Sequence, residues 1–185
     1  MRSQDAYSAL DDAQLMARLA QGERSALTTL VGRHQRRVLE TAYRLTGDRT
    51  LAEDIGQETF VRVWRSSQRY EPTARFSTWL YRIVLNLCID ASRKHTSPAP
   101  TPPDLPDAHS VHASDLMERD ERAAVVRRAV AALPERQRVA LVMHRFVGLS
   151  CREIAEATNW SGSAVESLLV RAYASLRQTL TDIAP

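Results

Sequence analysis

The 185-residue sequence contains few of the residues on which loop-built enzyme sites and disulfide-rich folds depend. It has six glycines and two cysteines, and it shows no glycine-rich phosphate loop, no nucleophile elbow and no paired acid and base. An active site built on loops therefore has little support. Cys88 and Cys151 fall inside apolar helical patterns in different halves of the chain, without metal-ligand spacing. We expect both to be buried free thiols in a reducing compartment.

Long apolar runs are also absent. No run approaches the roughly 18 residues that a membrane span needs, and residues 1–12 carry no signal sequence, so we expect a cytoplasmic protein without direct membrane insertion. His95, His109 and His112 invite a metal hypothesis, but they lie in or beside a proline-rich stretch and lack a carboxylate cluster in register. We expect no metal and no cofactor. A small helical metalloenzyme that uses these histidines stays as an alternative, and metal analysis of the purified protein would test it.

Charge is small in sum and uneven along the chain. The formal net charge is +3, and Lys94 is the one lysine among 25 basic residues. Residues 1–95 carry a net +4, residues 96–115 a net −3 and residues 116–185 a net +2. Two basic blocks thus flank an acidic connector, without the excess of basic charge expected of a histone-like coating protein.

Proline marks the domain boundary. Five of the eight prolines fall between residues 98 and 106, where hydrophobic periodicity also disappears, so this stretch cannot be the interior of a helix or strand. We predict an all-α protein of two small helical domains, residues 1–95 and 115–185, joined by a flexible Pro-rich linker over residues 96–114. At about 3.1 Å per residue in polyproline II form, such a linker could span several tens of Å.

Four helices are expected before the linker. The first runs from a cap at Asp11 or Asp12 to a stop near Gly22, and the second runs from about Glu23 to Thr46, with Gly47 as its stop. The third opens at Thr50, where Glu53 would complete a capping box. The fourth carries an apolar stripe at helical period. The members of this stripe are Phe76, Trp79, Leu80, Ile83, Val84, Leu87 and Ala91.

After the linker the pattern predicts a helix-turn-helix. One helix ends before Pro134, and another runs from Glu135 to Phe146. A second capping box, Ser150 with Glu153, then opens a short helix that is followed by a turn and a longer helix capped by Ser161. If this last helix enters a major groove, its exposed N-terminal positions must meet base edges. These positions are Ser163, Glu166, Ser167, Val170 and Arg171. Arg171 suits guanine, and Glu166 suits the cytosine amino group.

Two further faces carry polar side chains. Asp54, Glu58, Arg62 and Arg65 cluster on one side of the third helix with Gln57 beside them. On the fourth helix, basic and polar residues lie next to the aromatics Tyr70, Phe76, Trp79 and Tyr81, an arrangement that suits single-stranded nucleic acid. The basic and polar residues of this face are Arg75, Thr78, Arg82, Asn86, Asp90, Arg93 and Lys94.

Two stretches together resemble one family. The run from Ala52 to Trp64, with Phe76 to Asp90, resembles region two of extracytoplasmic-function sigma factors. The run from Ala132 to Arg138, with Gly148 to Ala155, resembles their region four. The regions occur in the family's order and cover about four-fifths of the chain.

The resemblance implies a sigma factor that performs no chemistry of its own. Asp54, Gln57 and Glu58 of the Asp-x-x-Gln-Glu stretch would dock on the clamp helices of the polymerase's largest subunit, with Arg62 and Arg65 beside them. Region four would read the −35 element and touch the polymerase flap. An anti-sigma factor, often membrane-anchored, would mask these faces. Residues expected at the −10 element are Tyr70, Arg75, Thr78, Arg82, Asn86, Arg93 and Lys94. Residues expected at the −35 element are Ser161, Ser163, Glu166, Ser167 and Arg171.

The chain departs from the resemblance at one place. Many relatives have a basic residue just after the valine of the last helix and an arginine two positions later, where this chain has Glu166 and Leu168. We therefore expect weak binding of the −35 element by this domain alone. A stand-alone helix-turn-helix regulator is the other alternative, although it leaves the polar stripe between Asp54 and Glu58 unexplained.

Overall fold

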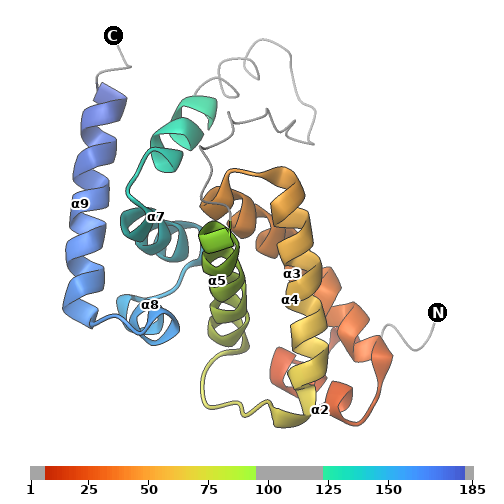
Figure 1. Cartoon of the computed structure of the whole chain (residues 1–185). Helices are drawn as coiled ribbons and strands as arrows, with labels where there is room; N and C mark the ends of the chain where they lie inside the picture. Colours follow the sequence, from red (N-terminus) through yellow and green to blue (C-terminus); the bar gives the residue numbers. More distant parts are fainter. Residues whose placement is uncertain (1–6, 95–122, 182–185) are drawn as a thin grey trace. The chain divides into compact units, whose positions relative to one another are not determined.

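The computed structural model describes residues 7–94 and 123–181. Within these residues every regular element is a helix, and the chain divides into two compact units, one before residue 95 and one after residue 122 (Figure 1). Among the described helices, none combines the length and the apolar character that crossing a membrane requires. The expected all-α class with two helical domains is confirmed. The linker and its boundaries lie outside the described residues and stay predictions.

Within the described residues, the N-terminal unit contains four helices of nine residues or more. They are α2 (Asp12–Ala20), α3 (Arg24–Thr46), α4 (Arg49–Ser66) and α5 (Phe76–Lys94), with the short 3-10 helix η1 (Ser67–Arg69) after α4. Helix α3 packs against both α2 and α5, and α2 also packs against η1. The core is mostly apolar, with Thr41 and Thr59 as buried polar residues. Side chains with essentially no exposure include Leu15, Met16, Leu30, Val38, Val63, Leu80 and Val84.

Local sequence signals set most of the helix ends in this unit. The Asp11 carboxylate accepts a hydrogen bond from the Gln14 N–H at 2.8 Å, and the Gln14 side chain accepts one from the Asp11 N–H at 2.9 Å. This capping box satisfies two N–H groups that a helix start leaves free. Gly47 ends α3 with a φ of 73°, which glycine adopts without a steric cost. The prediction that Thr50 caps α4 is wrong, because the helix begins at Arg49 and Thr50 lies inside its first turn.

Helix α5 buries a wider face than the predicted stripe. Phe76, Leu80 and Val84 are buried as expected, while Trp79, Ile83 and Leu87 are half-buried. Tyr81, Leu85 and Cys88 are also buried, and α5 packs on α3. Burial raises the pKa of the Cys88 thiol to about 12, so this cysteine behaves as a small apolar residue. The expectation of a buried thiol holds for Cys88, whereas Cys151 is only half-buried.

The C-terminal unit places a helix-turn-helix on a supporting helix. Residues 123–131 are helical, and α7 (Glu135–Leu141) follows Pro134. Then come η2 (Val142–Val147), α8 (Cys151–Thr158) and α9 (Gly162–Thr181). Helix α9 packs against both α7 and α8. The shared core includes Ala140, Leu141, Val142, Met143, Ile154, Val165 and Ala172.

The helix expected over residues 135–146 changes its pitch. Its last six residues form η2, a π-helical segment, so the single regular α-helix that the sequence predicts is wrong in this part. The segment ends at Gly148, whose φ of 85° reverses the chain. Ser150 then opens α8, and its predicted capping box with Glu153 is present. Gly148 and the capping box at Ser150 together determine where α8, the first helix of the helix-turn-helix, begins.

Candidate functional site

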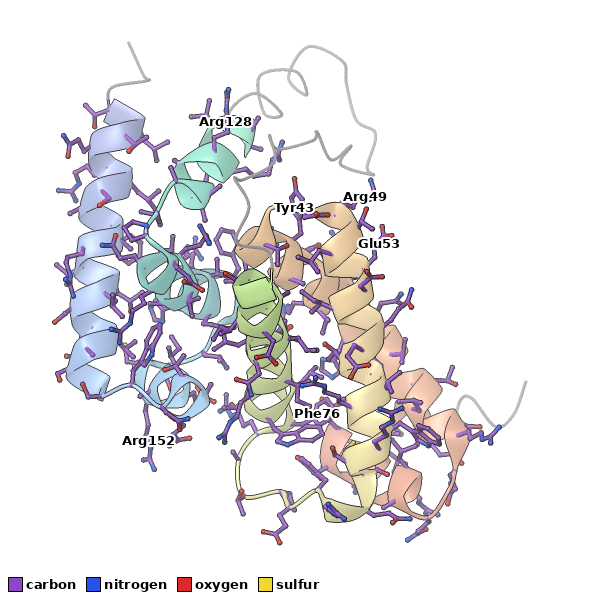
Figure 2. The ribbon with its side chains drawn as sticks, viewed as in Figure 1. Tyr43, Arg49, Glu53, Phe76, Arg128 and Arg152 are labelled. Carbon is purple, nitrogen blue, oxygen red and sulfur yellow. The ribbon has the colours of Figure 1, made fainter. Side chains whose placement is uncertain are left out.

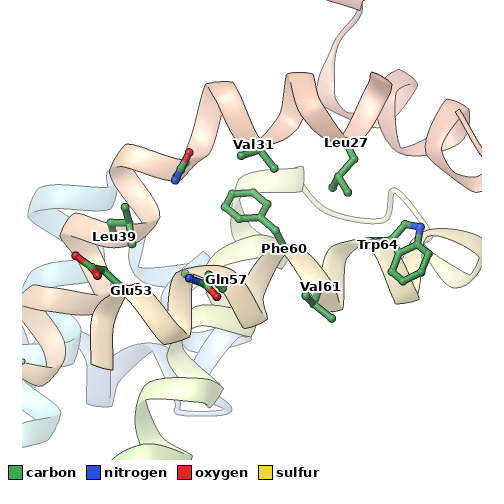
Figure 3. Close-up of a pocket in the computed structure, with 10 residues that line it drawn as sticks. Leu27, Val31, Leu39, Glu53, Gln57, Phe60, Val61 and Trp64 are labelled. Carbon is green, nitrogen blue, oxygen red and sulfur yellow. The ribbon is translucent and has the colours of Figure 1, made fainter. Parts of the chain in front are cut away.

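A groove runs between α3 and α4 in the N-terminal unit, with a volume of about 590 Å³ (Figure 3). Its walls are apolar, with Leu27, Val31 and Leu39 from α3 facing residues of α4. The α4 wall consists of Phe60, Val61 and Trp64, and the polar side chains along the groove are Gln35, Glu53 and Gln57. An apolar trough with polar edges is the shape that accepts an amphipathic helix of a partner protein.

Gly56 leaves room for the Leu39 side chain of α3 at this groove. A Cβ atom at residue 56 would lie 2.7 Å from Cδ2 of Leu39, closer than real Cβ contacts allow. Gly56 is buried in the middle of α4, where glycine lowers helix stability. The close approach therefore accounts for a residue that helix propensity alone would disfavour.

The predicted polar stripe of α4 lies next to the groove. Asp54, Gln57 and Arg65 are exposed, and Gln57 also lines the groove. Glu58 accepts a hydrogen bond from Arg62 at 3.0 Å, with both side chains 41% exposed. An ion pair at this exposure contributes little to stability, so both groups can exchange it for a partner's charges at low cost. The structure thus places the stripe and the groove on neighbouring faces of one helix.

Trp64 is the feature of this surface that the sequence did not predict. Its side chain is 50% exposed and lines the end of the groove, whereas Phe60 and Val63 of the same helix are buried. Tryptophan is enriched among the residues that dominate protein–protein binding energy. The signal was present in the sequence, since Phe60, Val61 and Trp64 recur at helical spacing beside Gln57. The opposite wall of the groove, on α3, could not be predicted in this way, because it depends on how α3 and α4 pair.

A second polar surface follows α5 and the connection before it. Arg75, Arg82 and Asn86 are exposed as expected. The expectation that Thr78 belongs to this exposed face is wrong, because it is 5% exposed and turned into the bundle. Arg93 and Lys94 lie at the end of α5, and their side chains are outside the described residues.

The aromatic residues near this surface pack on one another. The ring of Tyr70 lies 4.9 Å from that of Trp79 and 6.1 Å from that of Phe76, and Phe76 lies 5.8 Å from Trp79. Phe76 is buried, and Figure 2 shows it at the start of α5. Tyr81 is also buried, and burial raises its pKa to about 12. Phe76 and Tyr81 therefore serve as core, while Tyr70 and Trp79 are half-buried at the edge of the surface.

The helix-turn-helix presents the N-terminal half of α9. Ser163, Glu166, Ser167 and Arg171 are exposed, and Val170 is 69% exposed. The opposite face is buried as predicted, with Val165, Leu168, Leu169 and Ala172 in the core. Ser161 caps α9, since its hydroxyl accepts from the Ala164 N–H at 3.2 Å. Because Leu168 is buried, its side chain is packing, and a base-reading role at that position is lost.

One backbone conformation and two contacts that the sequence did not predict shape this motif. Asn159 ends α8 in the left-handed conformation, with a φ of 57°, which asparagine tolerates better than most residues. The Arg136 guanidinium of α7 lies 4.6 Å from the ring centre of Trp160 in the turn, a cation–π geometry. His144 Nδ1 donates to the Leu149 carbonyl at 2.9 Å. These contacts orient α8 and the turn relative to α7.

The histidines of the metal hypothesis, His95, His109 and His112, lie outside the described residues. Among residues 7–94 and 123–181, no group of three or more histidine, cysteine or acidic side chains could hold a metal ion.

Two family profiles match the chain in order. Sigma-70 region 2 matches residues 30–97, and Sigma-70, region 4 matches residues 123–176. RNA polymerase sigma-H factor of Pseudomonas aeruginosa is 30% identical over 93% of this chain and 95% of its own length. ECF RNA polymerase sigma factor SigM of Mycobacterium tuberculosis is 32% identical over 91% of this chain and 84% of its own length.

Solved structures show the same architecture. CnrH, in complex with the cytosolic domain of CnrY, is 27% identical with a TM-score of 0.71, and the alignment covers 94% of this chain and 99% of CnrH. The sigma factor RpoE of Bartonella quintana, in complex with the anti-sigma factor NepR, shares the fold with a TM-score of 0.69 at 18% identity, over 83% of this chain and 96% of RpoE. The region matches and the relatives at 30% identity and above place this chain in the extracytoplasmic-function (ECF) family of RNA polymerase sigma factors.

Proposed function

We propose that this sigma factor binds core RNA polymerase through the α3/α4 groove and its polar edge, and directs the enzyme to promoters that carry two separated elements. The observation that carries the proposal is the pairing of an apolar groove with the Asp54 to Glu58 stripe on one helix, inside the region 2 match. The chain itself contributes binding and no catalytic step. Because its proposed partner is core RNA polymerase, we expect the chain to act in the cytoplasm.

The groove would receive the clamp helices of the largest polymerase subunit. Burial of Trp64, together with the half-buried Val31 and Val61, against an apolar helix face would supply most of the free energy, because these side chains still have apolar area to remove from water. Asp54 and Glu58 would then pair with basic residues at the rim and fix the register of the partner helix. This assignment agrees with the family resemblance of the Asp-x-x-Gln-Glu stretch.

Promoter reading would be divided between the two units. Arg75 lies exposed in the connection before α5, Arg82 and Asn86 lie exposed on α5, and these side chains would contact the phosphates and unstacked bases of the −10 element. Ser163, Ser167 and Arg171 at the start of α9 would meet base edges of the −35 element, while its capped N-terminus favours a phosphate. Two weak contacts on one chain gain effective concentration, so neither needs to be strong alone.

An anti-sigma factor would hold the protein inactive by covering these surfaces. CnrH and RpoE, which share the fold, were solved as complexes with CnrY and NepR. The α3/α4 groove is the apolar surface that such an inhibitor would have to cover to block polymerase binding. We propose an inhibitor that competes with core enzyme for this groove.

The test is a pull-down with core polymerase followed by run-off transcription on sheared genomic DNA of the source bacterium. We expect the chain to bind core and to produce transcripts with fixed start sites, and Asp54→Ala and Glu58→Ala to reduce both. DNA binding without core association would instead support a stand-alone helix-turn-helix regulator.

A further inference from the structure

We propose that helix α2 is a positioning element for promoter opening, and that it acts through the Asp12–His34 pair on the aromatic cluster that anchors residues 70–75. The inference rests on the proposed function, because it concerns the connection expected to meet the −10 element. It goes beyond the family match, since α2 ends at Ala20 and the region 2 profile begins at residue 30.

The first contact joins α2 to α3. His34 Nε2 lies 2.8 Å from an Asp12 carboxylate oxygen, and Arg33 donates to the other oxygen at 2.9 Å. A carboxylate only accepts, so His34 donates from Nε2. The hydrogen bond from His34, together with Arg33, lowers the pKa of Asp12 despite its partial burial. Asp12 is the first residue of α2, and the capping box at Asp11 fixes its backbone.

The second contact carries this fixed position to α5. The His34 ring centre lies 5.2 Å from that of Phe76, tilted by 53°. Because its ring nitrogen is held by Asp12, His34 cannot swing away from Phe76 without losing a hydrogen bond to a charged group. Phe76 is the first residue of α5 and is buried. The orientation of the histidine ring therefore sets one wall of the site that Phe76 occupies.

The third contact reaches the far end of the connection. Tyr70 packs edge-on against both Phe76 and Trp79. Its hydroxyl is buried and has no hydrogen-bond partner among the described residues, and burial together with the nearby charge of Asp12 raises its pKa. Tyr70 is thus held by its ring, since its hydroxyl makes no bond that would fix it. Removing a wall of the cluster should let this end of the connection move.

Between these two anchors the connection is open to solvent. All five residues from Glu71 to Arg75 are exposed, and the Thr73 N–H to Glu71 carbonyl bond of 2.8 Å is a backbone bond within the turn. The positions of side chains that would contact DNA from such a segment depend on how its two ends are held. The ends are Tyr70 and Phe76, and both belong to the cluster that the Asp12–His34 pair supports.

The experiment compares Asp12→Ala and His34→Ala with Arg36→Ala in reconstituted holoenzyme. Arg36 is the matched control, because it lies on α3 as His34 does and its side chain, paired with Glu40, is highly exposed. The promoter is the strongest one found by the genomic run-off assay, and permanganate reactivity of its −10 thymines measures opening. We expect opening to slow about tenfold in Asp12→Ala and His34→Ala, the loss for a hydrogen bond to a charged group. Core affinity should match that of Arg36→Ala.

Two further variants separate positioning from folding. Asp12→Asn keeps an oxygen that can accept from His34, so it should recover much of the opening rate. In a Trp64→Phe, Trp160→Phe background Trp79 is the one tryptophan left of three, and its emission in the free protein should shift in Asp12→Ala but not in Arg36→Ala. If His34→Ala loses helical circular dichroism, Asp12→Ala alone carries the test, because it truncates a side chain near the surface.

The inference is overturned if Asp12→Ala opens the promoter at the rate of Arg36→Ala, or if its whole deficit is explained by weaker core binding. Loss of core binding or of transcription by the wild-type protein would instead overturn the proposed function. The two failures are therefore distinguishable.

Discussion

Single residues decide how strongly the C-terminal unit can hold DNA. Glu166 is exposed at the start of α9, on the face that would enter the major groove, and there a carboxylate repels phosphate. Its position was predictable from helical spacing. The burial of Leu168, also expected from the apolar stripe, shows that this part of the departure from the family pattern serves packing.

We expect Glu166→Lys to raise promoter affinity and to make it more dependent on salt. The change replaces a repelled charge with one that can neutralise a phosphate, so the salt dependence should steepen by about one to two ions. Holoenzyme binding to the run-off promoter, titrated at several salt concentrations, measures both effects. Gln178→Lys, near the other end of the same helix, is the control. Equal or weaker binding by Glu166→Lys would contradict this orientation of α9.

Asp12 gives the N-terminal unit a defined acid sensitivity. Its pKa is lowered in the folded protein, chiefly by the hydrogen bond from His34. A lowered pKa contributes stability above the unfolded value of 3.8, and this contribution is lost as pH falls through the folded pKa. The stability difference between wild type and Asp12→Asn should therefore shrink from pH about 5 to pH about 3. Urea unfolding measures it, with exposed Asp90→Asn as the control; a constant difference for Asp12→Asn would contradict the pairing.

At the scale of elements, the sequence predicted what local chemistry determines. The starts of α2 and α8 follow from capping boxes, and the end of α3 follows from Gly47. The start of α4 and the π-helical end at η2 were missed, because several residues could cap α4 and because tertiary packing sets a change of helical pitch. The groove was missed for a related reason. Its α3 wall, Leu27 and Val31, depends on which helix faces meet.

Gly56 and Gly32 test the helix pairing that forms the groove. Both lie inside helices, but a Cβ at residue 32 would meet nothing within 4 Å, while one at residue 56 would press on Leu39. Gly32→Ala should stabilise the protein by about 0.4–1 kcal/mol. The unfolding free energy of Gly56→Ala should be lower than that of Gly32→Ala by about 1 kcal/mol or more, because Leu39 must move toward the groove. Urea unfolding compares them, and equal stabilisation would contradict the close approach.

At the scale of the whole molecule, the protein consists of two small helical units, and we propose that both contact promoter DNA while one of them binds core polymerase. The N-terminal unit holds the groove, the polar stripe and the exposed side of α5, and the C-terminal unit holds the exposed half of α9. Each unit has its own apolar core, so each can keep its surface in shape independently. The sequence predicted the two-unit plan and most of the polar residues. It did not predict the apolar groove, in which we place most of the binding energy.

We propose that core polymerase binds in the α3/α4 groove, and the affinity of core enzyme for Trp64→Ala tests this binding. Tyr173→Ala is the matched control, since Tyr173 is 46% exposed on α9 and Trp64 is 50% exposed on α4. We expect Trp64→Ala to weaken core binding by at least about tenfold, because an exposed tryptophan that a partner covers is the kind of residue that dominates binding energy, and Tyr173→Ala to bind as the wild type does. Equal affinities for the two variants would contradict the account.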